Sequence, residues 1–449
     1  MDKGLGGLMI SKKLFERSWL DAYTNLRRIM LDPVKRSDFI IADFFVNDAA
    51  KDILTEFNVQ IAVIYPAMLF NMAPASYISS MPPFQFHVAL TSENMSLRSR
   101  VKNELVPLWG LPFIVAWFLW LKRMRKKHGV QYPVTMAPKP SHLVLVNTFF
   151  GLETPRDLPP LIAMVGPILS DTYPPLDDQY IAFLETHKRT IYIALGTHLV
   201  LPESDLSKIL QGLLLAMDAG HIDGVIWSLG KSPRSHFNRE KVLKRSDGSN
   251  FLVGDMLDGA HPDFLTPMFA PQRAILEHPH TALYFTHCGG SSANEVLFHG
   301  KPVLAMPFDF DQPRNSVSLV HNGVGLCLNK SRFTSSEIAD KIGIIVKDDT
   351  GSFARNVERM KRISRIASKR KYLAADLVEE VMYDQELRIV DGKATLPMHL
   401  QTADCRMPIW KTGNWDLKGL LIGGLIFAAG TTWWVSRASV RLLRSYIYA

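Results

Sequence analysis

The sequence predicts an α/β protein with two doubly wound domains and one transmembrane helix at the C-terminus. Short apolar runs alternate with helical stretches along most of the 449 residues, a pattern typical of parallel sheets. The proline-rich residues 158–176 interrupt this alternation and predict a linker between domains. Residues 419–436 carry no charge, and a helix of that length spans about 27 Å, close to a hydrocarbon core of ~30 Å.

Composition excludes several classes of protein. With 47% hydrophobic and 21% charged residues, the chain is neither disordered nor of low complexity. Its 51 basic and 43 acidic residues leave a net charge of +8, which is too dilute to predict a nucleic-acid partner. Cys288, Cys327 and Cys405 are spaced for neither a zinc site nor a disulfide framework, so no metal site is expected.

The first domain, residues 1–165, is expected to contain an incomplete sheet. Strands are predicted at residues 38–46, 60–64 and 143–147, and a helix over residues 47–57 joins the first two. Ahead of them, residues 13–31 predict one long helix rather than further strands.

The second domain, residues 181–400, follows a linker at residues 166–180 and is expected to be complete. Its strands are predicted at residues 190–195, 224–228, 282–286, 302–306 and 325–328. Residues 401–416 then connect to the transmembrane helix, 417–436, and to a basic tail, 437–449. Tryptophans near the end of this helix and arginines beyond it predict a cytoplasmic tail, and a buried terminal helix is the alternative.

Two further segments are apolar or basic enough to suggest surfaces. Residues 105–127 are apolar with a basic end, and Pro107 and Pro112 argue against a full membrane span. This segment therefore predicts an element that lies on the membrane surface or re-enters it. A core helix with a solvated basic end is an equally open alternative. The basic residues 355–371 predict a surface helix that packs through Val357, Met360, Ile363 and Ile366.

The segment from Phe269 to Asn315 predicts a site for a phosphorylated ligand. A strand delivers His287 and a turn with Gly289 and Gly290 to a helix that opens with two serines, Ser291 and Ser292. Glycines let a ligand approach the backbone, and the free N–H groups and positive dipole of a helix N-terminus favour a phosphate, to which His287 can donate as well.

Carboxylates in the same segment extend the prediction to a nucleotide sugar. Glu295 lies on the same side of that helix, where it can accept both hydroxyls of a ribose. Asp311 and Gln312 follow the next strand, at the edge where ligands bind in open α/β sheets. A nicotinamide-dependent oxidoreductase would need G-x-G-x-x-G after a first strand, which Gly4-Leu5-Gly6 does not provide.

This segment resembles the UDP-sugar-dependent glycosyltransferases of GT-B fold, a resemblance that implies two Rossmann-like domains. It implies that Phe269, in a uridine-binding segment with Ala270, stacks on uracil and that Gln272 contacts the uridine. It further implies that His287, Ser291 and Ser292, beside Gly289, bind the diphosphate, and that Gly196 and Thr197 form a second turn facing it. Glu295 would then bind the ribose, and Asp311 and Gln312 would bind the sugar. Phe269, Gly290 and Ser291 depart from the pattern of the plant enzymes.

The resemblance also implies a catalytic pair on the acceptor side. Asp43 takes the place of the aspartate that orients a general-base histidine, but no histidine precedes His87, and about three β-α units are missing ahead of Asp43. Their loss would leave the strand of Asp43 with an unpaired apolar edge. Three explanations stay open: a sequence lacking its N-terminal part, a binding-only relative, or another base such as His87 or His142.

The sequence therefore predicts transfer of a hexose from a UDP-sugar, with inversion, to a hydroxyl of a lipophilic small-molecule acceptor. A catalytically inactive UDP-sugar-binding relative is the alternative. No metal is implied, since the helix N-terminus, His287 and the serines neutralise the diphosphate. The expected location is a membrane, by a single pass, with the endoplasmic reticulum favoured by the resemblance.

Overall fold

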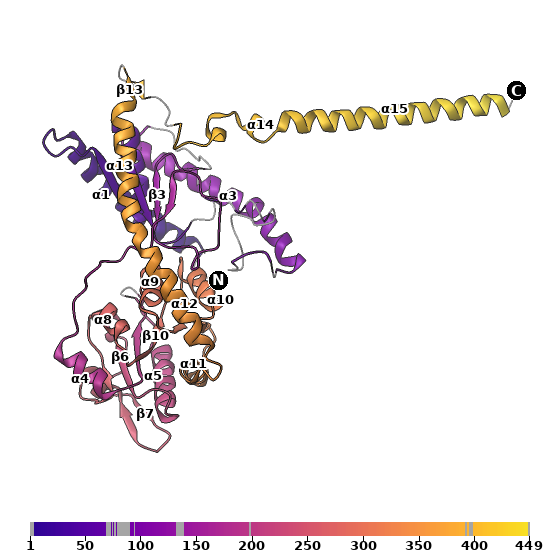
Figure 1. Cartoon of the computed structure of the whole chain (residues 1–449). Coiled ribbons are helices and arrows are strands. Elements are labelled where there is room, and N and C mark those ends of the chain that lie inside the picture. Colours follow the sequence, from indigo (N-terminus) through magenta and orange to yellow (C-terminus); the bar gives the residue numbers. More distant parts are fainter. Residues whose placement is uncertain are drawn as a thin grey trace. The chain divides into compact units, whose positions relative to one another are not determined.

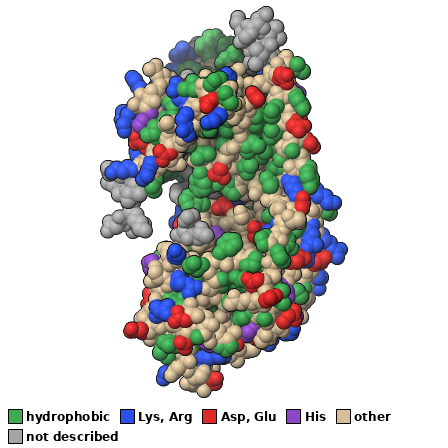
Figure 2. Space-filling model, turned by 90° about the vertical axis from the view of Figure 1, so that its left-hand side faces the viewer, with side chains coloured by type: hydrophobic (Ala, Val, Ile, Leu, Met, Phe, Trp, Pro, Cys, Tyr) green, Lys and Arg blue, Asp and Glu red, His purple; other side chains and the backbone are tan. Residues whose placement is uncertain are grey.

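The structure is a computed structural model that describes residues 4–447 except 69–72, 74, 76–77, 79–89, 94, 132–138, 197–198, 391–392 and 395–397. Its contacts divide the chain into two units, Met1–Ala394 and Thr395–Ala449, which are described separately below. The first unit contains two parallel sheets (Figure 1). On the face shown in Figure 2, basic and acidic side chains are interspersed, as expected where a small net charge is spread over a long chain.

The first sheet has four parallel strands in the order β1-β2-β3-β4. They are β1 (Phe39–Asp43), β2 (Gln60–Tyr65), β3 (Leu143–Val146) and β4 (Ile162–Met164). The three predicted strands are present, but the first ends at Asp43, because the Asp43 carboxylate accepts the N–H of Phe45 (2.9 Å) and caps the short helix η1 (Phe44–Val46). Strand β1 lies at the end of the sheet order, and Ile41 in it is 58% exposed.

Three helices pack together beside this sheet: α1 (Gly4–Leu31), α2 (Asn47–Phe57) and α3 (Leu97–Lys127). One buried polar cluster joins all three. Asp52 of α2 accepts from Trp19 Nε1 of α1 (2.9 Å) and pairs with the Arg125 guanidinium of α3, whose Nε lies 2.8 Å from the carboxylate. Since an isolated buried charge is unstable, Asp52 and Arg125 each need the other as a partner.

Helix α3 runs continuously through Pro107 and Pro112, so the prolines are no argument against a helix of spanning length. A proline removes one hydrogen bond to the residue four positions earlier, and a long helix can be kinked by it without ending there. The apolar middle of α3 is exposed at Trp109 and Phe113. At its C-terminal end Arg125 is buried, whereas the other basic side chains, Lys122, Arg123, Lys126 and Lys127, are exposed.

The second sheet has six parallel strands in the order β12-β11-β10-β5-β6-β9. In chain order they are β5 (Thr190–Ala194), β6 (Gly224–Trp227), β9 (Phe264–Leu265), β10 (Thr281–Thr286), β11 (Val303–Ala305) and β12 (Gly325–Cys327). The chain builds outward from β5 in one direction and then returns to build from β10 in the other. The strand order therefore reverses between β5 and β10, which is where a doubly wound sheet binds ligands.

Helices cover both faces of this sheet, which accounts for its nearly continuous apolar strands. Helices α5 (Glu203–Asp218) and α11 (Ser335–Lys347) pack on one face with Ile191 and Ile193 of β5. Helices α8 (Gln272–Glu277), α9 (Gly290–His299) and α12 (Ser352–Ala367) pack on the other face with Tyr192 and Tyr284. Shorter elements complete the domain: α4 (Asp178–Thr186), α6 (Lys231–Arg234), α7 (Val253–Asp258), α10 (Gln312–His321), and the hairpin of β7 (Val242–Lys244) and β8 (Asn250–Leu252).

The predicted packing face of residues 355–371 was partly wrong. In α12 the buried residues are Val357, Met360, Ser364 and Ala367, whereas Ile366 is 67% exposed. A repeat of three residues drifts around a helix of 3.6 residues per turn, so spacings of three and four alternate on one face.

After α12, the chain returns to the first sheet. Following η2 (Ser368–Arg370), helix α13 (Lys371–Arg388) contacts β2 and β3, and Gln385 Nε2 donates to the carbonyl of Asn58 (2.6 Å) (Figure 1). The strands β13 (Ile389–Val390) and β14 (Lys393–Ala394) pair at the end of this unit.

The second unit contains η3 (Ala403–Arg406), α14 (Ile409–Thr412) and the long helix α15 (Trp415–Ile447). Within the described residues, α3 and α15 are the two helices long and apolar enough to cross a membrane by length and composition. Within its own unit, the apolar window of α15 is unburied.

Candidate active site

The centre of the candidate site is the edge of the second sheet where β5 and β10 end. Gly196 follows β5 with φ +94°, and His287 follows β10. The two residues are in contact, since a Cβ placed on Gly196 would lie 3.1 Å from His287 Nε2, and one placed on Gly289 would lie 2.7 Å from the same atom. The glycines therefore leave room for the imidazole where the strand order reverses.

His287 and the start of α9 form a cradle for an anion. Gly289 is the N-cap of α9, Ser291 is exposed in its first turn and Ser292 is buried there. Burial lowers the pKa of His287, and a hydrogen bond to the backbone of Ala194 opposes that shift. Protonation beside a bound diphosphate would let both ring nitrogens donate. The N-terminal N–H groups of a ten-residue helix add the positive end of its dipole.

A buried polar network lies beside this cradle. Gln272 Nε2 donates to Glu295 Oε2 (2.6 Å), and Gln272 Oε1 accepts from the hydroxyls of Tyr284 (2.9 Å) and Tyr192 (3.2 Å). The Tyr284 hydroxyl also lies 3.3 Å from Ser292 Oγ. Burial raises the pKa of Glu295, and the hydrogen bond from Gln272 opposes that shift. The network fixes one carboxylate oxygen and leaves the other to accept from a ligand.

The turn before α10 brings Asp311 to the same edge. Asn315 Nδ2 donates to Asp311 Oδ2 (2.9 Å), and a Cβ placed on Gly290 would lie 3.2 Å from that oxygen. Gln312 Oε1 accepts the N–H of Phe308 (2.9 Å), so its amide nitrogen is the group that can donate to a ligand. Phe310 adopts φ +58° in this turn and is 88% exposed.

The remaining predicted donor residues differ in how well they are placed. Phe269 is 84% exposed, so its ring is accessible for stacking on a ligand, and its carbonyl accepts from the Tyr180 hydroxyl (3.4 Å). Ala270 is buried, and its carbonyl accepts the N–H of Gln272 (2.8 Å). Thr197 lies outside the described residues.

Comparisons with known proteins identify the family. Residues 23–371 match the family described as "UDP-glucoronosyl and UDP-glucosyl transferase". A UDP-glycosyltransferase from Talaromyces amestolkiae is 40% identical over 437 residues, which are 97% of this chain and 82% of that protein. The chain belongs to the UDP-glycosyltransferase family. It is accordingly a glycosyltransferase.

Solved structures of low sequence identity agree on the fold of this UDP-glycosyltransferase. The glycotransferase of kitacinnamycin aligns with a TM-score of 0.56 at 19% identity over 81% of each chain. Os79 from O. sativa aligns with a TM-score of 0.55 at 16% identity, over 80% of this chain and 81% of that one. The GT-B architecture predicted from the sequence is confirmed.

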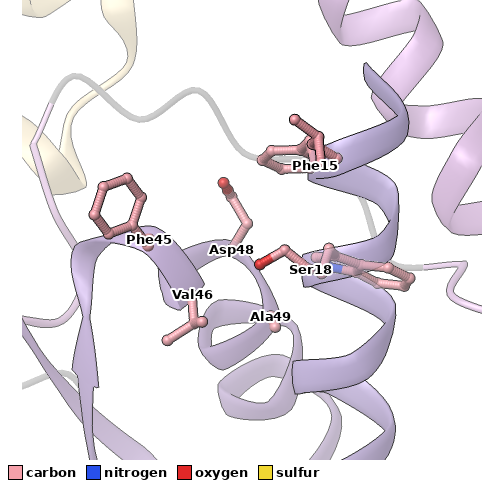
Figure 3. A pocket seen from close by; sticks show the side chains of 8 residues that line it. Phe15, Ser18, Phe45, Val46, Asp48 and Ala49 are labelled. Atoms are coloured by element: carbon pink, nitrogen blue, oxygen red, sulfur yellow. The ribbon is translucent and has the colours of Figure 1, made fainter. Parts of the chain in front are cut away.

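In the first sheet of this UDP-glycosyltransferase, Asp43 is exposed at the C-terminal end of β1. Beside it, α1 and the segment η1–α2 enclose a pocket of about 200 Å³ (Figure 3). Its lining residues are Leu14, Phe15, Ser18, Trp19, Phe45, Val46, Asp48 and Ala49. This pocket belongs to the first sheet and is distinct from the cradle at α9.

His142 does not suit the role of an alternative base. It precedes β3, whereas Asp43 ends β1, so the two residues lie at opposite ends of a parallel sheet. Burial, aided by the charge of Lys51, lowers the pKa of His142 to about 3, which would make it a poor proton acceptor. His87 lies outside the described residues.

Among the described residues, one group has the composition of a metal site: Glu185, His278 and His280, whose ligand atoms lie within 4.8 Å of one another. The backbone N–H of His280 donates to His278 Nδ1 (3.3 Å), which leaves the ring proton on Nε2. Because that nitrogen faces Glu185 at 3.4 Å, the proton occupies the position that a metal ion would need. The group is better described as a surface hydrogen-bonded cluster.

The sequence analysis missed Tyr192 and Tyr284. They are register partners on β5 and β10, their rings stack at 5.1 Å, and both hydroxyls reach Gln272. Tyrosines within otherwise apolar strands were the signal, since a buried hydroxyl needs a polar partner.

Proposed function

We propose that this chain binds a UDP-sugar at the reversal point of the second sheet and transfers the sugar to a hydroxyl of a lipophilic small molecule. The observation that carries the proposal is the convergence of Gly196, His287 and the N-terminus of α9 at one edge. A diphosphate needs donors and positive charge there, and this arrangement supplies them without a metal.

The individual roles follow from the chemistry of each side chain. The diphosphate is assigned to His287 with Ser291, Ser292 and the backbone at Gly289, and to the turn at Gly196 and Thr197. Glu295 is assigned to the ribose and Gln272 to the uridine, with Phe269 stacking on the base beside Ala270. Asp311 and Gln312 are assigned to the hydroxyls of the sugar.

Transfer with inversion requires a balanced displacement. The acceptor oxygen forms a bond to the anomeric carbon while the bond from that carbon to the UDP phosphate oxygen breaks, and the acceptor proton passes to a base that Asp43 would orient. The first sheet, within residues 1–165, is assigned to the acceptor, and the second sheet, within residues 181–400, to the donor. Os79, of the same fold, has been crystallised with a trichothecene, which supports a lipophilic acceptor.

Membrane association is part of the proposal. Helix α15 would span the bilayer, with residues 437–449 in the cytoplasm, and a location in the endoplasmic reticulum would follow from the resemblance. The exposed apolar residues of α3, among them Leu108, Trp109 and Phe113, support a second contact, with exposed Lys122 and Arg123 facing anionic headgroups. A lipophilic acceptor would partition into the same bilayer.

Calorimetric titration with UDP tests the donor site. His287→Ala and Glu295→Ala should each weaken binding by about tenfold or more, since a hydrogen bond to a charged group contributes about 1.5–3 kcal/mol. His236→Ala, which removes an exposed histidine of the same domain, is the matched control. Unchanged affinity in both site variants would contradict the assignment.

Turnover tests the reaction itself. Detergent-solubilised protein should release UDP from a UDP-hexose in the presence of a hydroxylated sterol or aromatic acceptor, and the product's anomeric configuration should be opposite to that of the donor. UDP binding without any turnover over a panel of acceptors would contradict the transfer step, and retained configuration would contradict inversion.

A further inference from the structure

A buried ion pair joins the loop after β3 to the first turn of α10. Glu153 is 5% exposed and Arg314 is 8% exposed, and their charged atoms approach to 2.5 Å between Arg314 Nη2 and Glu153 Oε2. The residues are far apart in sequence: Glu153 lies between β3 and β4 of the first sheet, and Arg314 lies in the helix between β11 and β12 of the second. Two charges removed from water at such a crossing require close mutual pairing.

The same pair also holds the loop that follows β2. The backbone N–H of Met68 donates to Glu153 Oε1 (3.0 Å), and the Met68 carbonyl accepts from Arg314 Nη1 (2.9 Å). Met68 is therefore bound through both of its backbone groups, one by each member of the pair. Three segments that end at the interdomain edge meet at this point: the loop after β2, the loop after β3 and the start of α10.

Two neighbouring contacts repeat the connection. Asn294 Nδ2 of α9 donates to the carbonyl of Asn147 (2.7 Å), and Asn322 Nδ2 at the end of α10 donates to the carbonyl of Gly151 (2.7 Å). The turn that contains Glu153 is thus held to the second sheet along its whole length, from Asn147 onward.

We propose that Glu153, Arg314 and Met68 form a latch that positions the sugar-facing turn of α10 against the acceptor side. Arg314 lies three residues after Asp311, and Asn315 holds the Asp311 carboxylate, so a shift of Arg314 moves Asp311 with it. Glu153 and Arg314 are positioning residues, because neither is among the residues assigned to the UDP-sugar. The latch rests on the proposed function, in which Asp311 contacts the sugar.

Removing one charge should separate catalysis from UDP binding. Glu153→Gln keeps an oxygen for Met68 but removes the charge, and a misplacement of about 1 Å at reacting groups lowers turnover by roughly 100-fold. We expect kcat to fall at least tenfold, KM for the UDP-sugar to rise, and the dissociation constant of UDP alone to stay within threefold. Arg239→Gln, which breaks the exposed pair with Asp258, should leave all three values unchanged.

A double variant separates positioning from folding. A single substitution leaves an unpaired buried charge, whereas Glu153→Leu with Arg314→Met removes both charges together. Because Met68 loses both of its side-chain partners in this variant, the latch predicts a melting temperature above that of Glu153→Gln rather than full recovery, and no recovery of kcat. Recovery of both quantities would overturn the proposal, as would a folded Glu153→Gln protein with kcat within threefold of the parent value.

Hydrogen exchange provides a readout that does not need turnover. Arg314→Gln, a change on α10, should accelerate exchange at the amide of Met68 and through residues 147–153 in the other sheet. Acceleration confined to α10 would overturn the latch. If the parent chain binds UDP but shows no transfer, the proposed reaction fails while the exchange experiment still decides the latch.

Discussion

Replacing Gly289 by alanine should weaken UDP binding without removing any functional group. Gly289 caps α9 with φ −59° and ψ 153°, a backbone conformation that alanine also adopts. The added Cβ would lie 2.7 Å from His287 Nε2, whereas ordinary contacts begin at 3.4 Å. The imidazole must therefore retreat by about 0.7 Å from the position in which it faces the diphosphate.

The size of the effect follows from the hydrogen bond that is lost. A hydrogen bond to a charged group contributes about 1.5–3 kcal/mol, and it weakens steeply as its geometry departs from the optimum. A loss of about 1.4 kcal/mol raises the dissociation constant of UDP tenfold. Isothermal titration calorimetry of the full chain in detergent measures this change directly.

Gly230 offers a matched control for this substitution. It also caps a helix that follows a strand of the same sheet, with φ −60° and ψ 170° at the start of α6. A Cβ there would meet only Pro233 Cδ, at 3.9 Å, so Gly230→Ala should leave UDP affinity unchanged. Affinity within twofold of the parent value in Gly289→Ala as well would refute the placement of His287 against the diphosphate.

Two further predictions concern protonation and stability. Burial lowers the pKa of free His287 and a bound diphosphate would raise it, so UDP affinity should increase as the pH falls through the range between the two pKa values. His287→Asn should remove this pH dependence. Equal pH dependence of the affinity in both proteins, measured by calorimetry, would contradict the prediction, since protonation of UDP itself is common to both. Arg125→Met should lower the free energy of unfolding of the first sheet by about 3 kcal/mol, because it leaves Asp52 buried with one donor. The control Arg27→Met, which breaks the exposed pair with Glu56, should change it by less than about 1 kcal/mol. Urea unfolding followed by tryptophan fluorescence measures both variants.

Most of the residues proposed for the donor site could be predicted to lie together because they belong to one continuous segment. From Phe269 to Asp311 the order of strand, turn and helix determines which side chains reach the carboxyl edge of the sheet, and only local structure is needed to place them. The partners of Gln272 were not readable, since Tyr192 comes from a strand some eighty residues earlier and its register with Tyr284 exists only in the folded sheet.

Helical details show a second limit of sequence patterns. The face of α12 was misassigned because Ile363 and Ile366 are apolar, yet the side chains that pack are small or polar as well, as Ser364 and Ala367 show. A hydrophobic pattern indicates which side chains can be buried, but the side of a helix that faces the core depends on the elements packed against it.

Two buried ion pairs of the described residues have different reasons to persist. The pair of Asp52 and Arg125 joins helices beside one sheet, where apolar residues of similar volume would stabilise the fold as well or better. The pair of Glu153 and Arg314 instead connects the loops of the first sheet to α10 through the backbone of Met68. Apolar replacements would bury apolar surface there but would not fix the position of α10. Directional contacts are needed where the relative position of two elements matters more than stability. Elements in apolar contact can shift against each other, whereas hydrogen-bonded ion pairs hold them in one geometry. A double variant that is more stable than the single variant and still loses turnover is therefore the outcome that distinguishes the second pair from the first.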